Sequence, residues 1–375
     1  MSSSPTPPPT TNTGTPSRPD LLALLASVPD PRARRGVRHQ LPAILAVGLA
    51  AVLAGARSFV AIGEWVAHQS TQTLTQLGVT GVAPGESTIR RAFTRLEADT
   101  LDALLGAHLW TRTAVIGGRR VIAIDGKTVR GARNKSSSAP HLVSAFDHHA
   151  GAVLGQVAVA AKSNEIPAVQ GLLDLFELAG AVVTVDAMHT QTDTAAAITA
   201  AGGDYVFTVK ANQPRLHAAC KNLPWAKVPA HSTLSRRHGR RARRTIKVLQ
   251  APAGVDFLGA TQIAQVRRTV TRAGKKSVEV VYLITSADHQ AAPPATLAAW
   301  VQGHWGIENQ LHWVRDVTYD EDRSQIRTGN APQVMATLRN TAISLLRLTG
   351  WTNIAAGLRH HARDPQDAVK LLLTC

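Results

Sequence analysis

Hydrophobic positions between residues 21 and 112 repeat with the period of an α-helix. The apolar segments LLALLASV, LPAILAVGLAAVLAG and FVAIGEWVAHQ are followed by the longer STIRRAFTRLEADTLDALLGAHLW, and all four fit helical spacing. Polar and glycine-containing segments separate them, as is usual between helices. The pattern predicts an all-helical N-terminal domain at residues 21–112.

The most apolar segment, residues 41–56, has the composition of a membrane span but not its length. It contains Pro42 and Gly48 and falls short of the roughly 20 residues needed to cross a bilayer. We expect a buried helix there and no membrane as partner. Residues 1–20 are rich in Pro, Thr and Ser and lack a charged start followed by an apolar stretch. They are predicted to be a disordered leader rather than a signal peptide.

After residue 118 short β-branched segments replace the helical pattern. Strands are predicted at residues 120–125, 141–147, 153–160 and 204–210 and in AVVTVDAM, with helices in AVQGLLDLFELAG and TAAAITAAGG. Periodicity alone gives an α/β fold with a mixed sheet. The order of three strands, a helix, a strand, a helix and a strand is, by analogy, that of an RNase H-like fold.

From about residue 212 to 288 the chain leaves this order and becomes basic. The segments RRTIKVLQA, FLGATQIAQVRRTV and KKSVEVVYLITSA predict strands joined by glycine-containing turns. We interpret the region as a β-strand insertion in a catalytic domain that spans residues 118–350. Residues 351–375 are predicted to form a C-terminal helical tail.

The chain is strongly basic, with 41 Lys and Arg residues, 25 Asp and Glu residues and a net charge of +16. Such a balance favours a polyanion, and nucleic acid is the first candidate. A positive charge can also serve solubility, but here the basic residues are grouped at 32–38, 90–95, 236–247 and 267–276, which solubility does not require.

Cysteine use indicates the cellular setting. Only Cys220 and Cys375 are present, with no CxxC motif, so the sequence supports neither a disulfide framework nor a zinc site. A reducing, cytoplasmic setting fits best.

Three acidic residues stand at the ends of apolar segments: Asp125 in VIAIDGKTVRG, Asp186 in VVTVDAMHTQ and Glu308 in HWGIENQLHW. If the strands that end at the two aspartates are neighbours, both carboxylates emerge at one edge of the sheet. Mg²⁺ prefers carboxylate oxygens, and two such ions can activate the attacking oxygen and stabilise the leaving oxygen of a phosphodiester. An aspartate at a strand end is also a common turn former, so each alone is a weak signal.

A spacing of three to four residues, as on one face of a helix, relates Trp305, Glu308, His312 and either Arg315 or Asp316. A carboxylate therefore lies between an aromatic and an imidazole on one helix face. We interpret Trp305 and Trp313 as core anchors and His312 as a packing residue rather than a ligand. Rivals of Glu308 as the third carboxylate are Asp316, Asp320, Glu321 and Asp322.

Several basic and polar residues are candidate DNA contacts. A helix capped by Ser87 or Thr88 would present its arginines to DNA, and arginines of the β insertion would follow phosphates. The alternative for each group is an ordinary solvated basic surface. The candidates are Arg90 and Arg91 on the helix, Arg240 and Arg244 in the insertion, Lys127, Arg130 and Arg133 after the first aspartate, and Lys210 with Asn212 after the fifth strand.

Long motifs in a fixed order carry a family resemblance. They are VPDPRARRGVRHQLPAILA, EWVA and STIRRAF in the N-terminal part, then AIDGKTVRGA, VVTVDAMHTQ, DYVFTVKANQP, HGR and HWGIENQLHWVRDVTYDED. From about Leu21 to Leu348 the chain resembles the ISAs-type, H-repeat-associated transposases of bacterial insertion sequences, which are DDE transposases with an RNase H-like catalytic domain.

The resemblance implies a catalytic triad of Asp125, Asp186 and Glu308 that binds two Mg²⁺ or Mn²⁺ ions. It implies cleavage at the transposon ends, attack of the freed 3′-hydroxyl on target DNA, and a role of the N-terminal domain in recognising the ends. We therefore expect DNA as partner, a homodimer or higher oligomer on that DNA, and association with the bacterial nucleoid.

The sequence also departs from related transposases. A tyrosine, an arginine and a lysine that often flank the glutamate are replaced by Val301, His304 and Arg315. Arg315 keeps a positive charge that could hold a phosphate, and His304 remains a candidate DNA contact, whereas Val301 cannot replace a tyrosine. A glutamate that commonly follows the HGR segment is replaced by Ala242.

Two other functions fit the same sequence. A metal-dependent nuclease without strand transfer would use the same three acids. A domesticated, non-catalytic DNA-binding protein would need the basic segments but not the acids.

Overall fold

The computed structural model describes residues 21–35, 37–113, 115, 118–134, 138–160, 163–237 and 239–374, with Arg237 described by its backbone only. The predicted leader 1–20, His238 of the HGR motif and Cys375 lie outside these residues.

The N-terminal part is helical, as predicted. Its helices are α1 (Leu21–Ala26), α2 (Leu41–Leu53), α3 (Phe59–Ala67), α4 (Thr71–Gln76), α5 (Glu86–Arg95) and α6 (Ala98–Arg112).

Helix α2 is buried on all sides, which confirms the interpretation of its apolar segment. Leu, Ile, Val and Ala occupy nearly all of its positions, so it has no polar face to turn to solvent, and all residues except Pro42 are buried. It contacts α1, α3, α5, α11, α12 and α13. Among the described residues, none of the helices combines the length and apolar character needed to cross a membrane.

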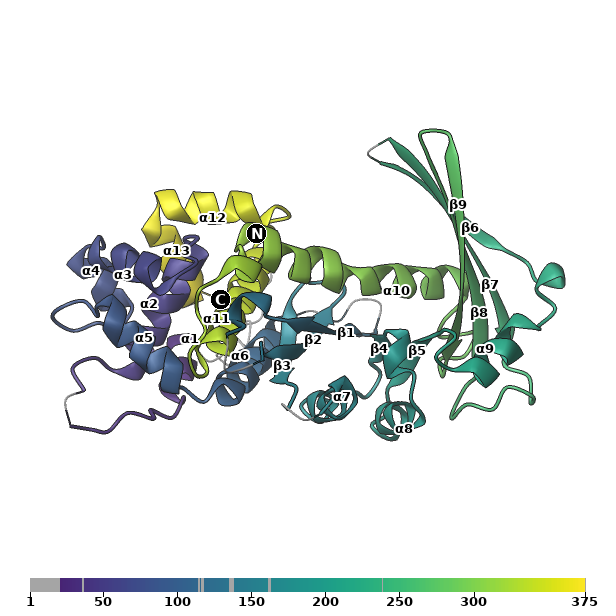
Figure 1. Cartoon of the computed structure of the whole chain (residues 1–375), viewed down its shortest axis with the longest axis horizontal. Helices are drawn as coiled ribbons and strands as arrows, with labels where there is room; N and C mark the ends of the chain where they lie inside the picture. Colours follow the sequence, from purple (N-terminus) through teal and green to yellow (C-terminus); the bar gives the residue numbers. More distant parts are fainter. Residues whose placement is uncertain are drawn as a thin grey trace, which may run out of the picture.

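The end of the chain returns to this helical core. Helix α11 (Ala331–Leu348) packs against α2, α5 and α6, and α12 (Ile354–Arg363) and α13 (Pro365–Thr374) also contact α2. Figure 1 shows α12 and α13 beside the N-terminal helices, far from the strands in the middle of the molecule. One hydrophobic core therefore unites residues distant in the sequence, such as Leu45, Phe93 and Leu338.

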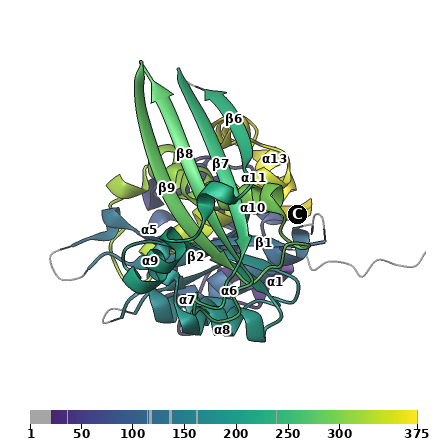
Figure 2. The same ribbon diagram turned by 90° about the vertical axis from the view of Figure 1, so that its right-hand side faces the viewer.

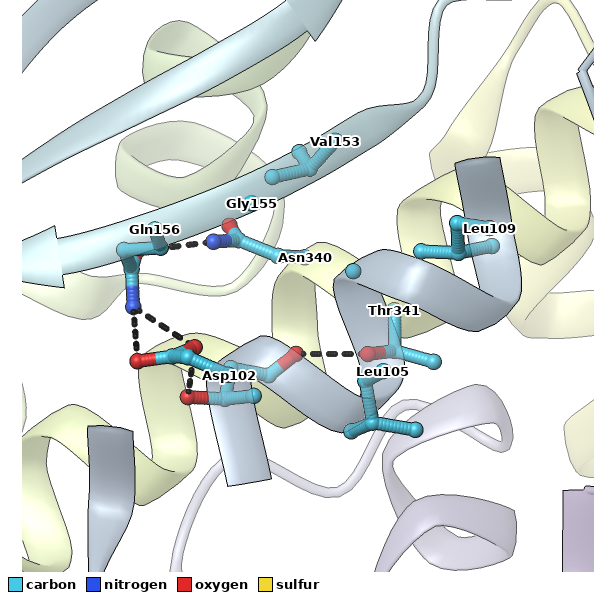
Figure 3. Close-up of a pocket in the computed structure, with 10 residues that line it drawn as sticks. Asp102, Leu105, Leu109, Val153, Gly155, Gln156, Asn340 and Thr341 are labelled. Carbon is cyan, nitrogen blue, oxygen red and sulfur yellow. Dashed lines mark hydrogen bonds between the residues drawn. The ribbon is translucent and has the colours of Figure 1, made fainter. Parts of the chain in front are cut away.

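A buried polar cluster joins this helical core to the sheet. Asp102 of α6 accepts hydrogen bonds from Nε2 of Gln156 at 3.2 Å and from the hydroxyl of Thr337 at 2.6 Å, while Asn340 donates to Gln156 (Figure 3). Burial raises the pKa of Asp102 to about 7, although hydrogen bonds from Gln333, Thr337 and Gln156 oppose the shift.

The central sheet has the order β3-β2-β1-β4-β5, in which β1, β4 and β5 pair in parallel and β2 pairs antiparallel with both β1 and β3. Helices α7 (Glu165–Leu173) and α8 (Thr192–Ala200) lie on one face, and α10 (Pro294–Gly306) lies on the other (Figures 1 and 2). This order confirms the predicted RNase H-like mixed sheet. The strands are β1 (Val121–Thr128), β2 (His141–Asp147), β3 (Val153–Ala158), β4 (Val182–Val185) and β5 (Asp204–Val209).

The basic insertion continues the same sheet as a four-stranded ribbon. After α9 (Pro214–Lys221) come β6 (His231–Arg237), β7 (Arg240–Gln250), β8 (Gln262–Arg272) and β9 (Lys275–Thr285), and β9 pairs antiparallel with β5. Because Tyr282 lies opposite Val209, the earlier residues of β9 extend beyond the carboxyl end of β5. The ribbon thus projects from the sheet edge that carries the aspartates, at the right of Figure 1.

Candidate active site

The two aspartates lie at one edge of the sheet, as predicted. Ile124 of β1 is paired with Val185 of β4 in parallel register, so Asp125 and Asp186 are the next residues of neighbouring strands. The predicted strand end at Asp125 is wrong, because β1 continues to Thr128. The antiparallel partner β2 holds this extension, whereas pairing with β4 stops before Asp125.

Glu308 lies where the helix that covers β1 and β4 changes its winding. Helix α10 ends at Gly306 and continues as a π-helical turn, Ile307–His312, in which the N–H of Trp313 donates to the carbonyl of Glu308. π-Helical turns are rare and often occur at functional sites. A second π-helical segment, Val314–Thr318, follows.

Two histidines flank Glu308 along this helix, and each faces one aspartate. Nε2 of His304 lies 3.9 Å from Oδ1 of Asp186, and Nδ1 of His312 lies 3.4 Å from Oδ2 of Asp125. Asp125, Glu308 and His312 each offer one ligand atom, and these atoms lie within 4.8 Å of one another. The donor set of two carboxylates and a nitrogen fits a divalent cation. The side chain of Asp186 is 48% exposed and is not in this group.

Burial and crowding control the charge of the site. Burial and then the charge of Glu308 raise the pKa of Asp125 to about 8, with Asp186 and Glu165 adding to the shift. Burial and the positive charges of Arg315 and Lys127 lower the pKa of His312 to about 3. A neutral imidazole therefore lies beside crowded carboxyl groups, and a bound cation would relieve their repulsion.

A hydrogen-bonded chain fixes His304. The hydroxyl of Thr184 on β4 lies 3.0 Å from Nδ1 of His304 and 3.2 Å from Nε2 of His148. Gly303 permits the close approach of His148 to this helix, because a Cβ at position 303 would lie 2.4 Å from Nδ1 of His148. Burial lowers the pKa of His304, and the charge of Asp186 opposes that shift.

A second constellation lies on the opposite face of the sheet, against Gly126 of β1. Oε1 of Glu165 lies 2.7 Å from Nε2 of His141, and Oε2 lies 2.9 Å from Nε2 of His189. Burial would raise the pKa of Glu165, but the hydrogen bonds of both histidines outweigh it and hold the pKa at about 2. A Cβ at Gly126 would lie 2.5 Å from Oε2 of Glu165.

Sequence reasoning missed this constellation, because its members come from β2, α7 and the turn after β4. The only available signal was the proximity of Gly126 to Asp125 and of His189 to Asp186 in the motifs AIDGK and VDAMH.

The rival carboxylates are engaged elsewhere. Asp316 accepts a 2.6 Å hydrogen bond from Nζ of Lys127, and Asp322 lies 3.5 Å from Arg130. Glu321 is fully buried between Arg315 and Arg339 at 2.7 and 2.8 Å. Burial would raise its pKa, but the two guanidinium charges hold the pKa at about 2. Asp320 occupies the left-handed backbone region before Glu321, with a φ of 55°.

Three predicted DNA contacts require correction. Arg315 is completely buried beside Glu321, so no phosphate can reach its guanidinium. Lys127 is buried and bound to Asp316, and His304 is buried against Thr184 and Asp186. These side chains belong to the interior of the site: Lys127 lies on β1, and His304 and Arg315 lie on the buried side of the helix that carries Glu308.

The remaining predicted contacts reach solvent to different degrees. Arg90, Arg91, Arg130, Arg133, Lys210, Asn212 and Arg240 are exposed, and Arg244 is half-buried. Arg90 hydrogen-bonds Glu86 at 2.7 Å, and the cap of its helix is Gly85 rather than Ser87 or Thr88. Nδ2 of Asn212 donates to the carbonyl of Ala187 and so ties the loop after β5 to the turn after β4.

The interpretation of the two tryptophans was wrong. Trp305 and Trp313 are 55% and 56% exposed, on the outer side of the helix that carries Glu308. The inner side is formed by buried residues such as Ile307 and Leu311. Helical spacing identifies a shared face but cannot tell which face meets the sheet.

Arg240 and Arg244 lie on the same face of the sheet as α10. Their strand also carries Ile246, which packs in one cluster with Leu297 and Trp300 of α10. Residues two apart in a strand share a face. Arg244 and Arg240 therefore face the side of the sheet on which Glu308 lies, and Arg243 faces the other side.

Comparisons with known proteins cover both the helical region and the sheet. Residues 116–345 match the family described as "Transposase DDE domain", and residues 22–109 match the one described as "DDE_Tnp_1-associated". "Putative transposase YncI" of Escherichia coli O157:H7 is 34% identical over 344 residues, which cover 87% of each chain. "H repeat-associated putative transposase YhhI" of Escherichia coli (strain K12) is 34% identical over 364 residues, which cover 92% of this chain and 94% of that one.

A solved structure of a piggyBac transposase in a synaptic complex with hairpin DNA is similar over 94% of this chain and 77% of that chain. The two are 11% identical in sequence, and the TM-score is 0.44.

Proposed function

This chain belongs to the family of transposase DDE domains, and from that premise we propose that it cuts DNA at the ends of an insertion sequence and joins them to target DNA. The observation that carries the proposal is the placement of Asp125, Asp186 and Glu308 at one edge of the sheet, in a basic protein. The expected cofactors are two Mg²⁺ or Mn²⁺ ions.

The reaction has two displacements at phosphorus. In the first, water forms a bond to phosphorus at the element end, the bond to the 3′-oxygen breaks, and that oxygen leaves as a hydroxyl with a proton. In the second, this hydroxyl oxygen forms a bond to the phosphorus of a target phosphodiester, the bond to a target 3′-oxygen breaks, and the hydroxyl proton passes to the displaced oxygen. The bound ions would supply Lewis-acid activation of the attacking and leaving oxygens.

Residues of this chain would hold the ions and orient the DNA phosphate. Asp125 and Glu308 would hold one ion, and Asp186 would contribute with Asp125 to the other. His304 would orient Asp186, because its other nitrogen is held by Thr184. Exposed Lys210 at the end of β5 would attract a phosphate toward this edge.

The ribbon would guide DNA toward the acids. It projects past the edge that carries Asp125 and Asp186, and Arg240 and Arg244 lie on its α10 side. Arginine forks bind phosphate oxygens without reading sequence. We also propose that the N-terminal helices, with Arg90 and Arg91, take part in binding the ends. The oligomeric state on DNA, a homodimer or higher oligomer, stays a prediction, and so does the association with the nucleoid.

The direct test combines the purified full-length chain, Mg²⁺, DNA bearing the element ends and a target plasmid. Joined products that need all three acids would support transposition. Cut ends that never join the plasmid would leave a nuclease as the function. DNA processing that is unchanged by Asp125→Asn, Asp186→Asn and Glu308→Gln would overturn the site assignment and favour a non-catalytic DNA-binding protein.

A further inference from the structure

His312 differs from a histidine that merely fills space. Its side chain is 7% exposed, and one of its ring nitrogens lies within 4.8 Å of ligand atoms of both Asp125 and Glu308. It follows Glu308 by four residues in the π-helical turn, so the same backbone segment positions both groups.

Hydrogen bonding alone does not account for this imidazole. The distance of 3.4 Å between Nδ1 of His312 and Oδ2 of Asp125 exceeds the roughly 2.7–2.9 Å of a strong charge-assisted hydrogen bond. Nε2 of His312 is buried, and within the part of the chain that the structure describes it has no hydrogen-bond partner. No hydrogen bond from the described residues therefore fixes the ring through Nε2, and Nδ1 is the nitrogen that lies nearest Asp125.

His304 shows what an orienting histidine looks like in the same site. Its Nδ1 is held by Thr184 at 3.0 Å, its Nε2 lies 3.9 Å from Asp186, and it is not a member of the group of mutually close ligand atoms. His304 is a positioning residue for Asp186. His312, by contrast, belongs to the group of mutually close ligand atoms that Asp125 and Glu308 form.

We propose that His312 supplies a nitrogen ligand to a divalent cation held by Asp125 and Glu308. The inference rests on the proposed metal-dependent function and adds a ligand to that site. Its consequence is a changed metal preference. Mg²⁺ is a hard ion that takes oxygen ligands, whereas imidazole nitrogen is better suited to first-row transition ions. The site should therefore favour Mn²⁺ over Mg²⁺ more strongly than a site made of carboxylates alone.

The test is pulsed electron paramagnetic resonance of Mn²⁺ bound to the full-length protein. We expect a ¹⁴N coupling typical of coordinated imidazole, which changes to the ¹⁵N pattern when only histidine is ¹⁵N-labelled. Labelling leaves the protein unaltered, so this measurement does not depend on the folding of a variant. The coupling should vanish in His312→Asn and persist in the matched variant His304→Asn.

Metal titrations provide a second readout. In His312→Asn we expect Mn²⁺ affinity to fall by about tenfold or more, with a smaller change for Mg²⁺, because the new side chain offers oxygen in place of nitrogen. Circular dichroism and thermal unfolding of both variants check that the fold is retained. An equal loss of affinity for Mn²⁺ and Mg²⁺ in His312→Asn would count against a nitrogen ligand.

The outcomes separate this inference from the proposed function. If Asp125→Asn abolishes cleavage while the nitrogen coupling is absent from wild type, or survives in His312→Asn, the ligand assignment is wrong and the proposed function stands. If wild type shows a coupling that needs His312 but never cuts or joins DNA, the ligand assignment stands and the proposed function is wrong.

Discussion

Ile124 and Val185 lie opposite each other in the parallel pair of β1 and β4. This single register relationship makes neighbours of the two residues that follow, Asp125 and Asp186, although 60 positions separate them in the sequence. A shift by one residue would send one carboxylate to the other face of the sheet. The pairing therefore decides that these acids can act together.

The first prediction concerns the three acids. Asp125→Asn, Asp186→Asn and Glu308→Gln should each lower metal-dependent DNA cleavage by at least about 100-fold, because each removes an anionic oxygen from the ion site. The measurement is the initial rate of end cleavage in Mg²⁺. Asp193→Asn makes the same chemical change at an exposed aspartate of α8 that is not in the group of close ligand atoms, and it should retain the wild-type rate. Similar rates for Asp193→Asn and Asp125→Asn would contradict the assignment.

Arg315 should matter for stability rather than for DNA binding. Arg315→Ala should lower the free energy of unfolding by about 3–5 kcal/mol, because it removes one partner of a buried ion pair with Glu321. Urea denaturation measures this loss. Arg130→Ala is the matched variant, since its side chain is 75% exposed, and it should change the free energy of unfolding by less than about 1 kcal/mol. Equal stability of the two variants would be inconsistent with the burial of Arg315.

The two faces of strand β7 should differ in DNA binding. Arg244→Ala should reduce the slope of log K against log salt by about 0.9, because it removes one phosphate contact. Arg243→Ala alters the neighbouring residue on the opposite face and should leave the slope unchanged. Affinity for end DNA measured from low to moderate salt gives both slopes. The same reduction in both variants would show that DNA does not distinguish the faces.

Exposed and buried tryptophans near Glu308 should contribute very differently to stability. Trp305→Ala and Trp313→Ala should lower the free energy of unfolding by less than about 1 kcal/mol, because both rings are more than half exposed. Trp300→Ala, in α10 and buried, should cost about 3–5 kcal/mol. Chemical denaturation of the three variants decides the point, and a large loss for Trp305→Ala would restore its interpretation as a core anchor.

Asp102 should make stability depend on pH. Its pKa is raised to about 7 in the folded protein, above the value of 3.8 for an unperturbed aspartate. Its contribution is therefore fully present below about pH 4 and is lost as pH rises through about 7, by up to roughly 4 kcal/mol. Asp102→Asn should flatten this part of the profile. Parallel pH profiles of unfolding for wild type and variant would contradict the raised pKa.

The sequence by itself determined the helical N-terminal part, the RNase H-like order of elements and the three acids. Hydrophobic period depends on neighbours along the chain, so helices such as α2 and strands such as β2 can be predicted locally. The acids stood out because Asp125 and Asp186 end apolar runs and Glu308 interrupts an aromatic-rich helix.

Only the tertiary structure decided what surrounds those acids. Whether Arg315 or Trp305 reaches solvent depends on which side of the helix meets the sheet, and helical spacing does not contain that information. Glu165, His141 and His189 meet through strands and turns far apart in the sequence. His312 likewise becomes a ligand candidate only because β1 passes beneath its π-helical turn, for contacts between distant segments are set by packing and not by local pattern.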